Sequence, residues 1–540
     1  MLSFIEYASE KRILELLIKE RVKAALKGKL KDVVPSETIR KTEQEKSLTT
    51  AEQISLLMPS RNSWRWPQKK DRVQKDGKEK KSEKQILTRC IATTIKMDRK
   101  SPDKHPYLER LNSFIEQVRN DITGNAPLEF SSIRITGKVK KVDAEGTTIL
   151  RPICIFESLR EKILIALASK YLSEIFDPLL HEEILSYRPL RRYHNSAEPV
   201  LTDRDNAIEN LQAYRNAHKR ETIYVAECDI QKYFDTINHD VIRRCFSKFA
   251  QKLQALYPDF EYAHVGRIVE AYLNSYSFYK NVVVENEKLM NGESPRKYES
   301  PKDELFIERG CYTAEEFNRS TGKIGIPQGG ALSGLISNIV LCTVDQESIL
   351  AKPDGKRFFC RYGDDIMLMH TSKDECNRLI KEYCNSLTKN KLLYHEFVSV
   401  ADKECVDWIG FLGYEIRYTG EVRMRRSSLN EKFKSIKRRY RTGAKTKVAK
   451  GEFKKELDKE IINRIERFKS DGLITAKSLT RNKYSTTQAL KLNSYASRWQ
   501  YRLLYKIAKR NNLPADATEK WWQTAKECGC INYLKTISKR

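Results

Sequence analysis

The chain has 540 residues, of which 40% are hydrophobic, and a net charge of +28 from 100 Lys and Arg against 72 Asp and Glu. This length excludes a single hydrophobic core and predicts two or three domains, while the charge favours a polyanionic partner such as nucleic acid. The basic excess is concentrated in residues 421–540, which hold 32 Lys and Arg against 11 Asp and Glu. A segment of this kind is typical of a clamp on a nucleic-acid backbone.

The first 85 residues predict a helical extension followed by a basic linker. Residues 2–20, LSFIEYASEKRILELLIKE, carry a charge every three or four positions, so we expect an amphipathic helix and no membrane span. Residues 67–85 are almost wholly polar, which is typical of a linker. The 12 cysteines include no pair at zinc-ligand spacing, so we expect reduced thiols in a cytoplasmic protein.

Helical and strand-like stretches alternate over residues 86–420. Residues 133–156 have the composition of strands around a turn, and residues 157–176 have the apolar spacing of a helix. Residues 222–230, TIYVAECDI, predict a strand that ends at Asp229. The carboxylate of Asp229 can therefore project from the carboxyl end of this strand.

Residues 322–341, GKIGIPQGGALSGLISNIVL, combine a glycine-rich loop with a helix. The glycines of the loop 325–330 let a backbone approach a flat base pair closely. Gln328 within this loop can both donate and accept a hydrogen bond, which suits the edge of a base or a sugar. The helix that follows has apolar residues at the spacing of one buried face: Leu332, Leu335, Ile336, Ile339 and Val340.

Residues 357–370, RFFCRYGDDIMLMH, predict a β-hairpin with two carboxylates at its tip. Gly363 suits the first central position of a type II′ turn, where φ is positive, and Asp364 and Asp365 follow it. Adjacent carboxylates in an apolar neighbourhood repel each other, and a divalent cation is the partner that best relieves this cost. A plain surface Gly-Asp turn is the alternative interpretation.

Three carboxylates from these two places in the chain can hold two Mg²⁺ ions about 3.5–4 Å apart. One ion would lower the pKa of a 3′-hydroxyl, and the other would neutralise a nucleoside triphosphate and the leaving pyrophosphate. Mg²⁺ takes oxygen ligands and draws part of its shell from substrate phosphates, so Asp229, Asp364 and Asp365 suffice. Mn²⁺ can take the same ligands.

Together these motifs resemble the palm of reverse transcriptases. DIQKYFD (229–235) resembles the first catalytic motif of that family, IPQGGALS (326–333) its template-primer loop, and RYGDD (361–365) its Tyr-x-Asp-Asp hairpin. Three more stretches resemble, in order, the two fingers motifs and the primer-grip hairpin of bacterial members: LRPICIFESLREKIL (150–164), SYRPLRR (186–192) and WIGFLGYEI (408–416).

The resemblance implies an α/β right-hand polymerase, with fingers and palm of antiparallel sheet and helices over 86–420. It also implies an all-helical thumb and C-terminal extension over 421–540. The catalytic residues and metal ligands it implies are Asp229, Asp364 and Asp365, with Ile230 as a further metal contact. The nucleotide or template contacts it implies are Arg151, Ile230, Phe234, Gln328 and Tyr362. The primer-grip residues it implies are Phe411, Leu412 and Gly413.

The motifs YFDTINH and PQGGALS resemble those of group II intron, retron and abortive-infection enzymes more than those of retroviral enzymes. Retrons usually have Ala where Gly363 stands, and the lack of any His after His395 argues against the zinc-bound nuclease of intron proteins. The resemblance therefore implies a bacterial defence-associated, unknown-group or abortive-infection reverse transcriptase with an antiviral role. Its partners would be dNTPs, a cDNA product and an RNA template, expected to be a structured non-coding RNA. Template-independent synthesis and homo-oligomerisation stay open.

Two other functions also stay open. RNA-dependent RNA polymerases share the two-metal palm but tend to have a carboxylate at the position of Phe234, where a bulky ring leaves no room for a ribose 2′-hydroxyl. Core packing is the other interpretation of Phe234. We expect Asp235 to point to the opposite face of an extended segment. A non-catalytic RNA-binding scaffold is the second alternative, although such relics usually lose a metal carboxylate.

The basic C-terminal region has the composition expected of a nucleic-acid grip. Residues 423–447 are dense in Arg and Lys, and at the thumb position they would bind the duplex backbone in a salt-dependent way. Trp499, Trp521 and Trp522 lie among basic residues further on. They are interpreted either as base-stacking platforms or as the core of packed helices.

Overall fold

The computed structural model describes residues 2–26, 48–66, 83–131, 133–188, 203–290, 296–352, 354–395, 408–417, 421–431, 433–434 and 488. Of the region 421–540, predicted to be an all-helical thumb and C-terminal extension, only residues 421–431, 433–434 and 488 are described, and this part begins with a strand, β9 (Val422–Met424), where a helix was predicted. The rest of that region, its three tryptophans and most of the linker 67–85 lie outside the described residues. No helix in the described ranges is long and apolar enough to cross a lipid bilayer. The nine cysteines within those ranges are buried, and none of them forms a disulfide.

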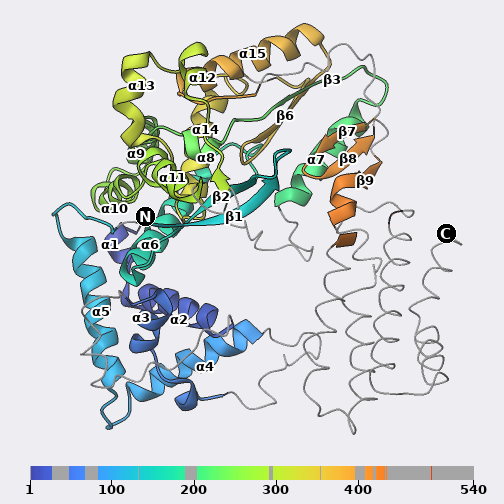
Figure 1. Cartoon of the computed structure of the whole chain (residues 1–540). Coiled ribbons are helices and arrows are strands. Elements are labelled where there is room, and N and C mark those ends of the chain that lie inside the picture. Colours follow the sequence, from blue (N-terminus) through green and yellow to red (C-terminus); the bar gives the residue numbers. More distant parts are fainter. Residues whose placement is uncertain are drawn as a thin grey trace, which may run out of the picture.

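The N-terminal part is a group of helices that packs against one long helix, α6 (Leu159–Phe176) (Figure 1). The group contains α1 (Phe4–Tyr7), α2 (Glu10–Leu26), α3 (Thr50–Leu57), α4 (Glu83–Asp98) and α5 (Pro106–Thr123). Ser3 and Thr49 begin α1 and α3 with capping boxes, which satisfy backbone N–H groups that a helix start leaves free. The stretch predicted as one amphipathic helix is two helices, because α1 ends at its cap residue Ala8.

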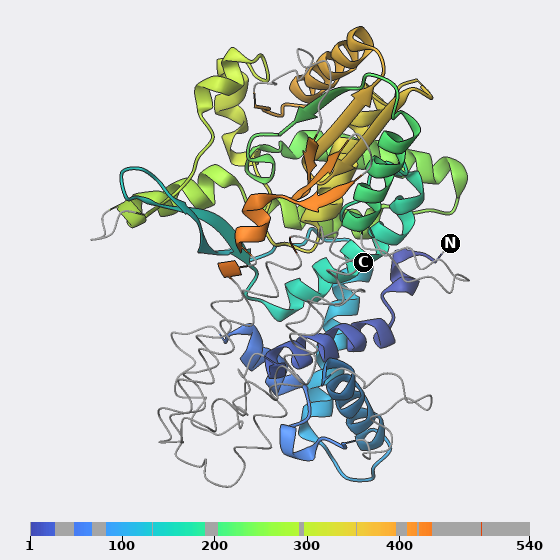
Figure 2. The same ribbon diagram turned by 90° about the vertical axis from the view of Figure 1, so that its right-hand side faces the viewer.

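The first sheet forms a hairpin that projects from the body of the molecule (Figure 2). Its order is β1-β2-β4, with β1 (Arg134–Val142) antiparallel to β2 (Thr148–Ile155) and β4 (Arg296–Tyr298) parallel to β2. The strands predicted over 133–156 and the helix predicted over 157–176 are confirmed. The parallel pairing brings a segment from far along the chain, the residues after β4, beside the hairpin.

The second sheet carries the predicted acidic hairpin. Its order is β3-β6-β5, all antiparallel, with β3 (Tyr224–Cys228), β5 (Arg357–Tyr362) and β6 (Asp365–His370). Alternate residues of β6 enter two hydrophobic clusters: Ile366 and Leu368 join the main core, and Met367 and Met369 join a second core. Because both faces of this sheet are buried, the residues that follow the two carboxylates are apolar at every position.

Helices cover the second sheet, and a third sheet packs against its far side (Figure 1). The third sheet is β7 (Trp408–Phe411), β8 (Tyr414–Arg417) and β9 (Val422–Met424). The helices of this half are α7 (Asp203–Ala217), α8 (Tyr233–Thr236), α9 (His239–Leu256), α10 (Ala263–Asn274), α11 (Val284–Met290), α12 (Asp303–Glu308), α13 (Ala314–Ser320), α14 (Ser333–Gln346) and α15 (Lys373–Lys389). The predicted helix after the glycine-rich loop is α14, and the predicted strand over 222–230 is β3.

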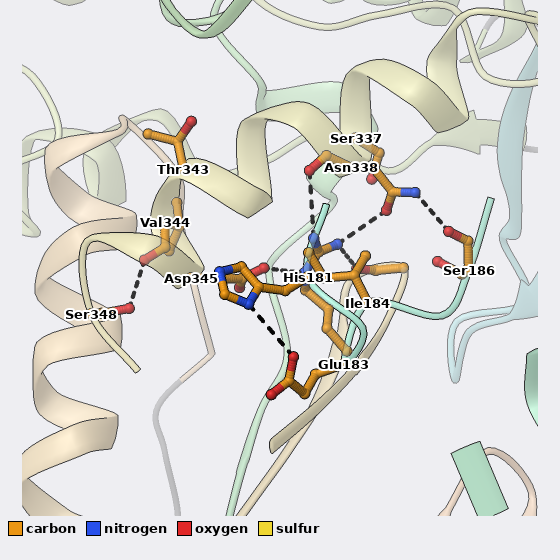
Figure 3. A network of polar contacts seen from close by, with 12 residues as sticks. His181, Glu183, Ile184, Ser186, Ser337, Asn338, Thr343, Val344, Asp345 and Ser348 are labelled. Carbon is orange, nitrogen blue, oxygen red and sulfur yellow. Dashed lines mark hydrogen bonds and ion pairs between the residues drawn. The ribbon is translucent and has the colours of Figure 1, made fainter. Parts of the chain in front are cut away.

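A fully buried ion pair joins the acidic hairpin to α14. Nε of Arg361 lies 2.8 Å from Oδ2 of Asp345, and neither side chain is exposed. The same guanidinium donates to Oδ1 of Asn338 at 3.2 Å and to the carbonyl oxygen of Gly363 at 3.3 Å. Asn338 donates in turn to the carbonyl oxygen of Ser186 at 2.6 Å (Figure 3). The network therefore holds the hairpin, α14 and the segment around Ser186 in one unit.

Removing one charge of this pair should destabilise the protein far more than removing an exposed charge. Arg361→Met leaves the Asp345 carboxylate buried without its cation, so we expect the free energy of unfolding to fall by about 3–5 kcal/mol. Urea unfolding followed by tryptophan fluorescence measures this loss. Arg378→Met, which removes a guanidinium paired with Glu375 on the surface of α15, is the matched control and should change little. Equal losses in the two variants would contradict the expectation.

Candidate active site

The acidic hairpin has the geometry that its sequence predicts. Tyr362 pairs with Asp365, so Gly363 and Asp364 form a two-residue turn, and Gly363 adopts a φ of +73°. A positive φ at this first central position is typical of a type II′ turn and is easily adopted by glycine. The carboxylates of Asp364 and Asp365 therefore stand at the tip of the sheet.

Asp229 lies at the same edge of the sheet as the hairpin tip. Cys228 pairs with Ile366, so the next residue of β3 comes beside Asp365. The backbone of Asp229 is held from the other side, because its carbonyl oxygen accepts a hydrogen bond from the N–H of His395 at 2.9 Å. Its side chain is 64% exposed, and Oδ2 lies 3.9 Å from Nε2 of His395.

Burial and neighbouring carboxylates raise the pKa of both Asp364 and Asp365. Burial and then the charge of Asp229 raise the pKa of Asp364. Partial burial raises the pKa of Asp365 to about 6, and the charges of Asp364, Asp229 and Glu227 add to the rise. The residue still keeps some contact with solvent. Uncompensated negative charge at a shared edge is the condition that a bound cation relieves.

The residues fit a divalent cation in donor type but do not form a closed cluster. Within the described ranges, no three side chains of His, Cys, Asp or Glu lie close enough together to hold an ion. The exposed Asp229 carboxylate lies near His395, so it would have to turn toward the hairpin to share an ion with Asp364 and Asp365. The side chain of Ile230 is a hydrocarbon that packs in the main core, and this residue can offer a cation only its main-chain oxygen.

A pocket of about 900 Å³ adjoins the hairpin tip. Its walls bring together four residues that the sequence singles out: Arg151 on β2, Phe234 on α8, Gln328 in the glycine-rich loop, and Asp364. The described residues that line it do not include the other predicted site residues: Asp229, Ile230, Tyr362, Asp365, Phe411, Leu412 and Gly413. This volume is within the range of sites for molecules the size of a nucleotide.

The glycine-rich loop is attached to the rest of the pocket by its backbone. The N–H of Gly325 donates to the carbonyl oxygen of Ile237, and the N–H of Ile326 donates to that of Phe234, each at 2.8 Å. The carbonyl oxygen of Gln328 accepts from Cys154 on β2 at 2.9 Å. The loop thus joins α8 to the first sheet, and the walls of the pocket form one hydrogen-bonded frame.

The structure corrects the prediction about Asp235. Residues 233–236 form the short helix α8, in which successive side chains are about 100° apart, whereas an extended segment would place them on opposite faces. Asp235 consequently lines the same pocket as Phe234. The carboxylate is buried and accepts a hydrogen bond from Nε2 of Gln328 at 2.8 Å.

Two lysines and a glutamate complete the pocket, and sequence reasoning missed all three. Nζ of Lys140 on β1 lies 3.0 Å from Oε2 of Glu299, and Nζ of Lys232 lies 3.8 Å from the same oxygen. Burial lowers the pKa of Lys232 to about 8. The sequence does show Lys232 inside the DIQKYFD motif, next to the predicted catalytic residues. No sequence pattern connects Lys232 to Glu299, because the pairing of β2 with β4 brings Glu299 to the pocket.

The residues predicted for the primer grip form the tip of a second hairpin. Phe411 pairs with Tyr414, and Leu412 and Gly413 between them both have positive φ, at 49° and 84°. Two positive φ values define a type I′ turn, which matches the twist of the flanking strands. Phe411 is buried in the second core, and Arg204 donates to the hydroxyl of Tyr414 at 2.6 Å.

Comparison with known proteins assigns the chain to a family. Residues 139–412, just over half of the chain, match the family described as reverse transcriptase (RNA-dependent DNA polymerase), and the chain therefore belongs to this family. The predicted α/β polymerase fold is thus confirmed for the fingers and palm. Reverse transcriptase domains use divalent metal ions, in accord with the acidic hairpin. No curated protein matches the chain by sequence.

Solved structures of telomerase are similar to the chain at low identity. Telomerase from Candida albicans with a fragment of telomeric RNA shares 12% identity at a TM-score of 0.38, over 86% of this chain and 76% of that one. Apo telomerase from Candida tropicalis shares 13% identity at a TM-score of 0.35, over 84% of this chain and 76% of that one. The family assignment rests on the sequence match.

A methyl group added to the glycine-rich loop should disrupt the pocket. A Cβ on Gly330 would overlap the hydroxyl of Tyr272, which is fully buried and bonded to Ser333. We expect Gly330→Ala to lower the melting temperature by several degrees, because overpacking a core costs about 1–3 kcal/mol. Gly355→Ala, where a Cβ meets no atom within 4 Å, is the matched control for calorimetry. An unchanged melting temperature for Gly330→Ala would show that the loop moves freely.

Proposed function

We propose that this protein is an RNA-directed DNA polymerase that adds deoxynucleotides to a 3′-hydroxyl. The observation that carries the proposal is the pocket beside the acidic hairpin, on whose walls Arg151, Phe234 and Gln328 meet Asp364. The membership of residues 139–412 in the reverse transcriptase family supports the same reaction. Asp229, Asp364 and Asp365 are the proposed catalytic residues.

The proposed metal ligands are the three carboxylates and the main-chain oxygen of Ile230. Two Mg²⁺ ions, or Mn²⁺ in their place, would activate the attacking hydroxyl and neutralise the charge of the triphosphate. The protein's own part is to hold Asp364 and Asp365 at a turn whose backbone is fixed by β5 and β6. Burial and the nearby charge of Asp229 raise the pKa of Asp364 and Asp365, which supports the proposal that the two carboxylates bind a cation.

The proposed nucleotide site uses opposite charges at its two ends. Arg151 from β2 lines the pocket together with Lys140 and Lys232, which share Glu299 as a partner, and the net positive charge of this group suits a triphosphate. Phe234 is proposed to pack against the sugar and to exclude a 2′-hydroxyl. Gln328 is proposed to contact a base or sugar edge.

The proposal also covers the domains of the chain, two further contact sites and a biological role. We divide the chain into an N-terminal helical extension (1–85), fingers and palm (86–420) and a basic helical thumb with a C-terminal extension (421–540). Tyr362 is a proposed substrate contact, and the proposed primer grip is Phe411, Leu412 and Gly413. We further propose a cytoplasmic enzyme of bacterial antiviral defence, either copying a structured non-coding RNA or synthesising DNA without a template, with homo-oligomers open to test. The support for this biological role is the similarity of the motifs YFDTINH and PQGGALS to those of bacterial reverse transcriptases.

Loss of one hairpin carboxylate should abolish DNA synthesis without loss of RNA binding. Asp364→Asn keeps the size of the side chain but removes a charged metal ligand, so we expect a fall in primer extension of about a thousandfold or more. RNA binding, measured by filter retention, should be unchanged. Asp374→Asn, an exposed carboxylate at the start of α15, is the control. If Asp364→Asn kept its biological activity, a non-catalytic RNA scaffold would be the better assignment.

A smaller side chain at position 234 should relax the choice of sugar. Phe234→Ala opens space beside the sugar, and we expect the ratio of deoxynucleotide to ribonucleotide incorporation to fall about tenfold or more. Single-nucleotide extension with each triphosphate measures this ratio. Phe114→Ala, a similar truncation on α5, is the control for lost apolar packing. Preferred ribonucleotide incorporation by the unmodified protein would instead favour an RNA-dependent RNA polymerase.

A further inference from the structure

A buried carboxylate lies directly behind the glutamine of the nucleotide pocket. Asp235 is 5% exposed, and its Oδ1 accepts the hydrogen bond from Nε2 of Gln328 at 2.8 Å. Asp235 forms no ion pair with any residue in the described ranges, and it is not among the proposed metal ligands. A buried carboxylate is costly, so its retention beside the pocket calls for a reason.

The two side chains are mounted on backbones that are bonded to each other. Ile326, two residues before Gln328, donates its N–H to the carbonyl oxygen of Phe234, the residue before Asp235. On its other side, Gln328 is held by the N–H of Cys154. The distance between Asp235 and Gln328 is therefore set by main-chain hydrogen bonds and does not depend on a bound substrate.

The chemistry of the pair fixes which way the amide of Gln328 points. An ionised carboxylate only accepts hydrogen bonds, so it must face the NH₂ group of the amide. The carbonyl oxygen Oε1 of Gln328 then points away from Asp235, and no described residue donates to it. Because Gln328 lines the pocket, Oε1 is available there as an acceptor. Without a partner such as Asp235, the amide could turn by 180° and present a donor instead.

We propose that Asp235 is a positioning residue, which holds Gln328 so that its amide oxygen faces the nucleotide pocket and accepts a hydrogen bond from the substrate. This inference rests on the proposed function. An incoming deoxynucleotide can donate from its sugar hydroxyl and, where the base is adenine, guanine or cytosine, from the amino group of the base. Both present the same chemistry to Oε1, and substrate analogues distinguish them.

The pKa of Asp235 decides the pH at which the hydrogen bond between Asp235 and Gln328 should be tested. Burial raises the pKa of Asp235 to about 7, against the opposing effects of Gln328, Lys232, Arg151 and Lys140. Cys154 and Tyr276 are the other titratable groups near Asp235. Assays at pH 8.5 therefore keep the carboxylate ionised and acceptor-only.

A double-mutant cycle tests whether Asp235 acts through Gln328. Asp235→Asn has the same shape but no longer dictates the direction of the amide, and Gln328→Ala removes the acceptor. We expect each single variant to lower kcat/KM for a deoxynucleotide about tenfold, and the double variant to be no worse than Gln328→Ala. Multiplied losses in the double variant would overturn the proposal. Asp240→Asn, an exposed carboxylate on α9, is the control.

A reciprocal exchange keeps the test independent of general destabilisation. Gln328→Glu places two carboxylates against each other and should lose activity, whereas D235N/Q328E restores a donor and an acceptor in swapped places. We expect this double variant to regain at least tenfold of the activity that Q328E loses. Failure to regain it, with melting temperatures equal to that of the wild type, would also overturn the proposal.

Analogues identify which substrate donor meets the oxygen. If it is the sugar hydroxyl, a 3′-deoxy nucleotide should be insensitive to Asp235→Asn; if it is the base, dITP should be insensitive where dGTP is not. Full sensitivity to Asp235→Asn with every analogue would contradict both. If the unmodified protein joins no nucleotide at all, the proposed function itself fails; if it does and the cycle is multiplicative, only this inference fails.

Discussion

The position of the acidic hairpin depends on the buried ion pair between Arg361 and Asp345. Burial raises the pKa of Asp345 to about 6, and Arg361 offsets only part of that rise, so the pair is a poor source of stability. Its contribution is geometric. The guanidinium spans α14 and the turn, while the backbone of Arg361 exchanges hydrogen bonds with Glu183 and Leu185. One residue thereby sets where Asp364 stands and where the neighbouring wall of the pocket begins.

The wall of the pocket next to the hairpin is formed by Tyr187, which contacts both the hairpin turn and α14. Tyr187 follows the segment held by Asn338 and has a φ of +56°, a conformation that a bulky residue rarely adopts without constraint. Its ring lies against Gly334 and Gly363, where any side chain at Gly334 would come within 2.9 Å of it. Glycine at position 334 lets the ring approach α14, and the glycine at position 363 is required for the positive φ of the turn. Gly363 at the hairpin turn therefore lies next to Tyr187, a residue that lines the pocket.

Periodic and local features were predictable from the sequence, and contacts between distant segments were not. The strands around 133–156, the helix α6 and the turn at Gly363 follow from apolar spacing and turn chemistry, which act over a few residues. The helix α8 was missed because DIQKYFD is short and sits beside a strand, and with it the position of Asp235. Glu299 was missed because its place beside Lys140 comes from a parallel strand pairing across more than a hundred residues.

The proposed site has an acidic side at the hairpin tip and a basic side at Arg151, Lys140 and Lys232, and different sheets supply the two sides. Acidic groups collect where β3 ends and β6 begins, at one edge of the palm sheet. Cations collect where β1 and β2 approach Lys232 from the fingers, and Glu299 offsets part of their charge. A nucleoside triphosphate is strongly anionic at one end and carries only hydrogen-bonding groups at the other. Placed in such a pocket, its phosphates would be drawn toward Arg151 and the lysines, and its sugar would be left beside Phe234 and Gln328. The orientation that polymerisation needs thus follows from how charge is divided between the two sheets.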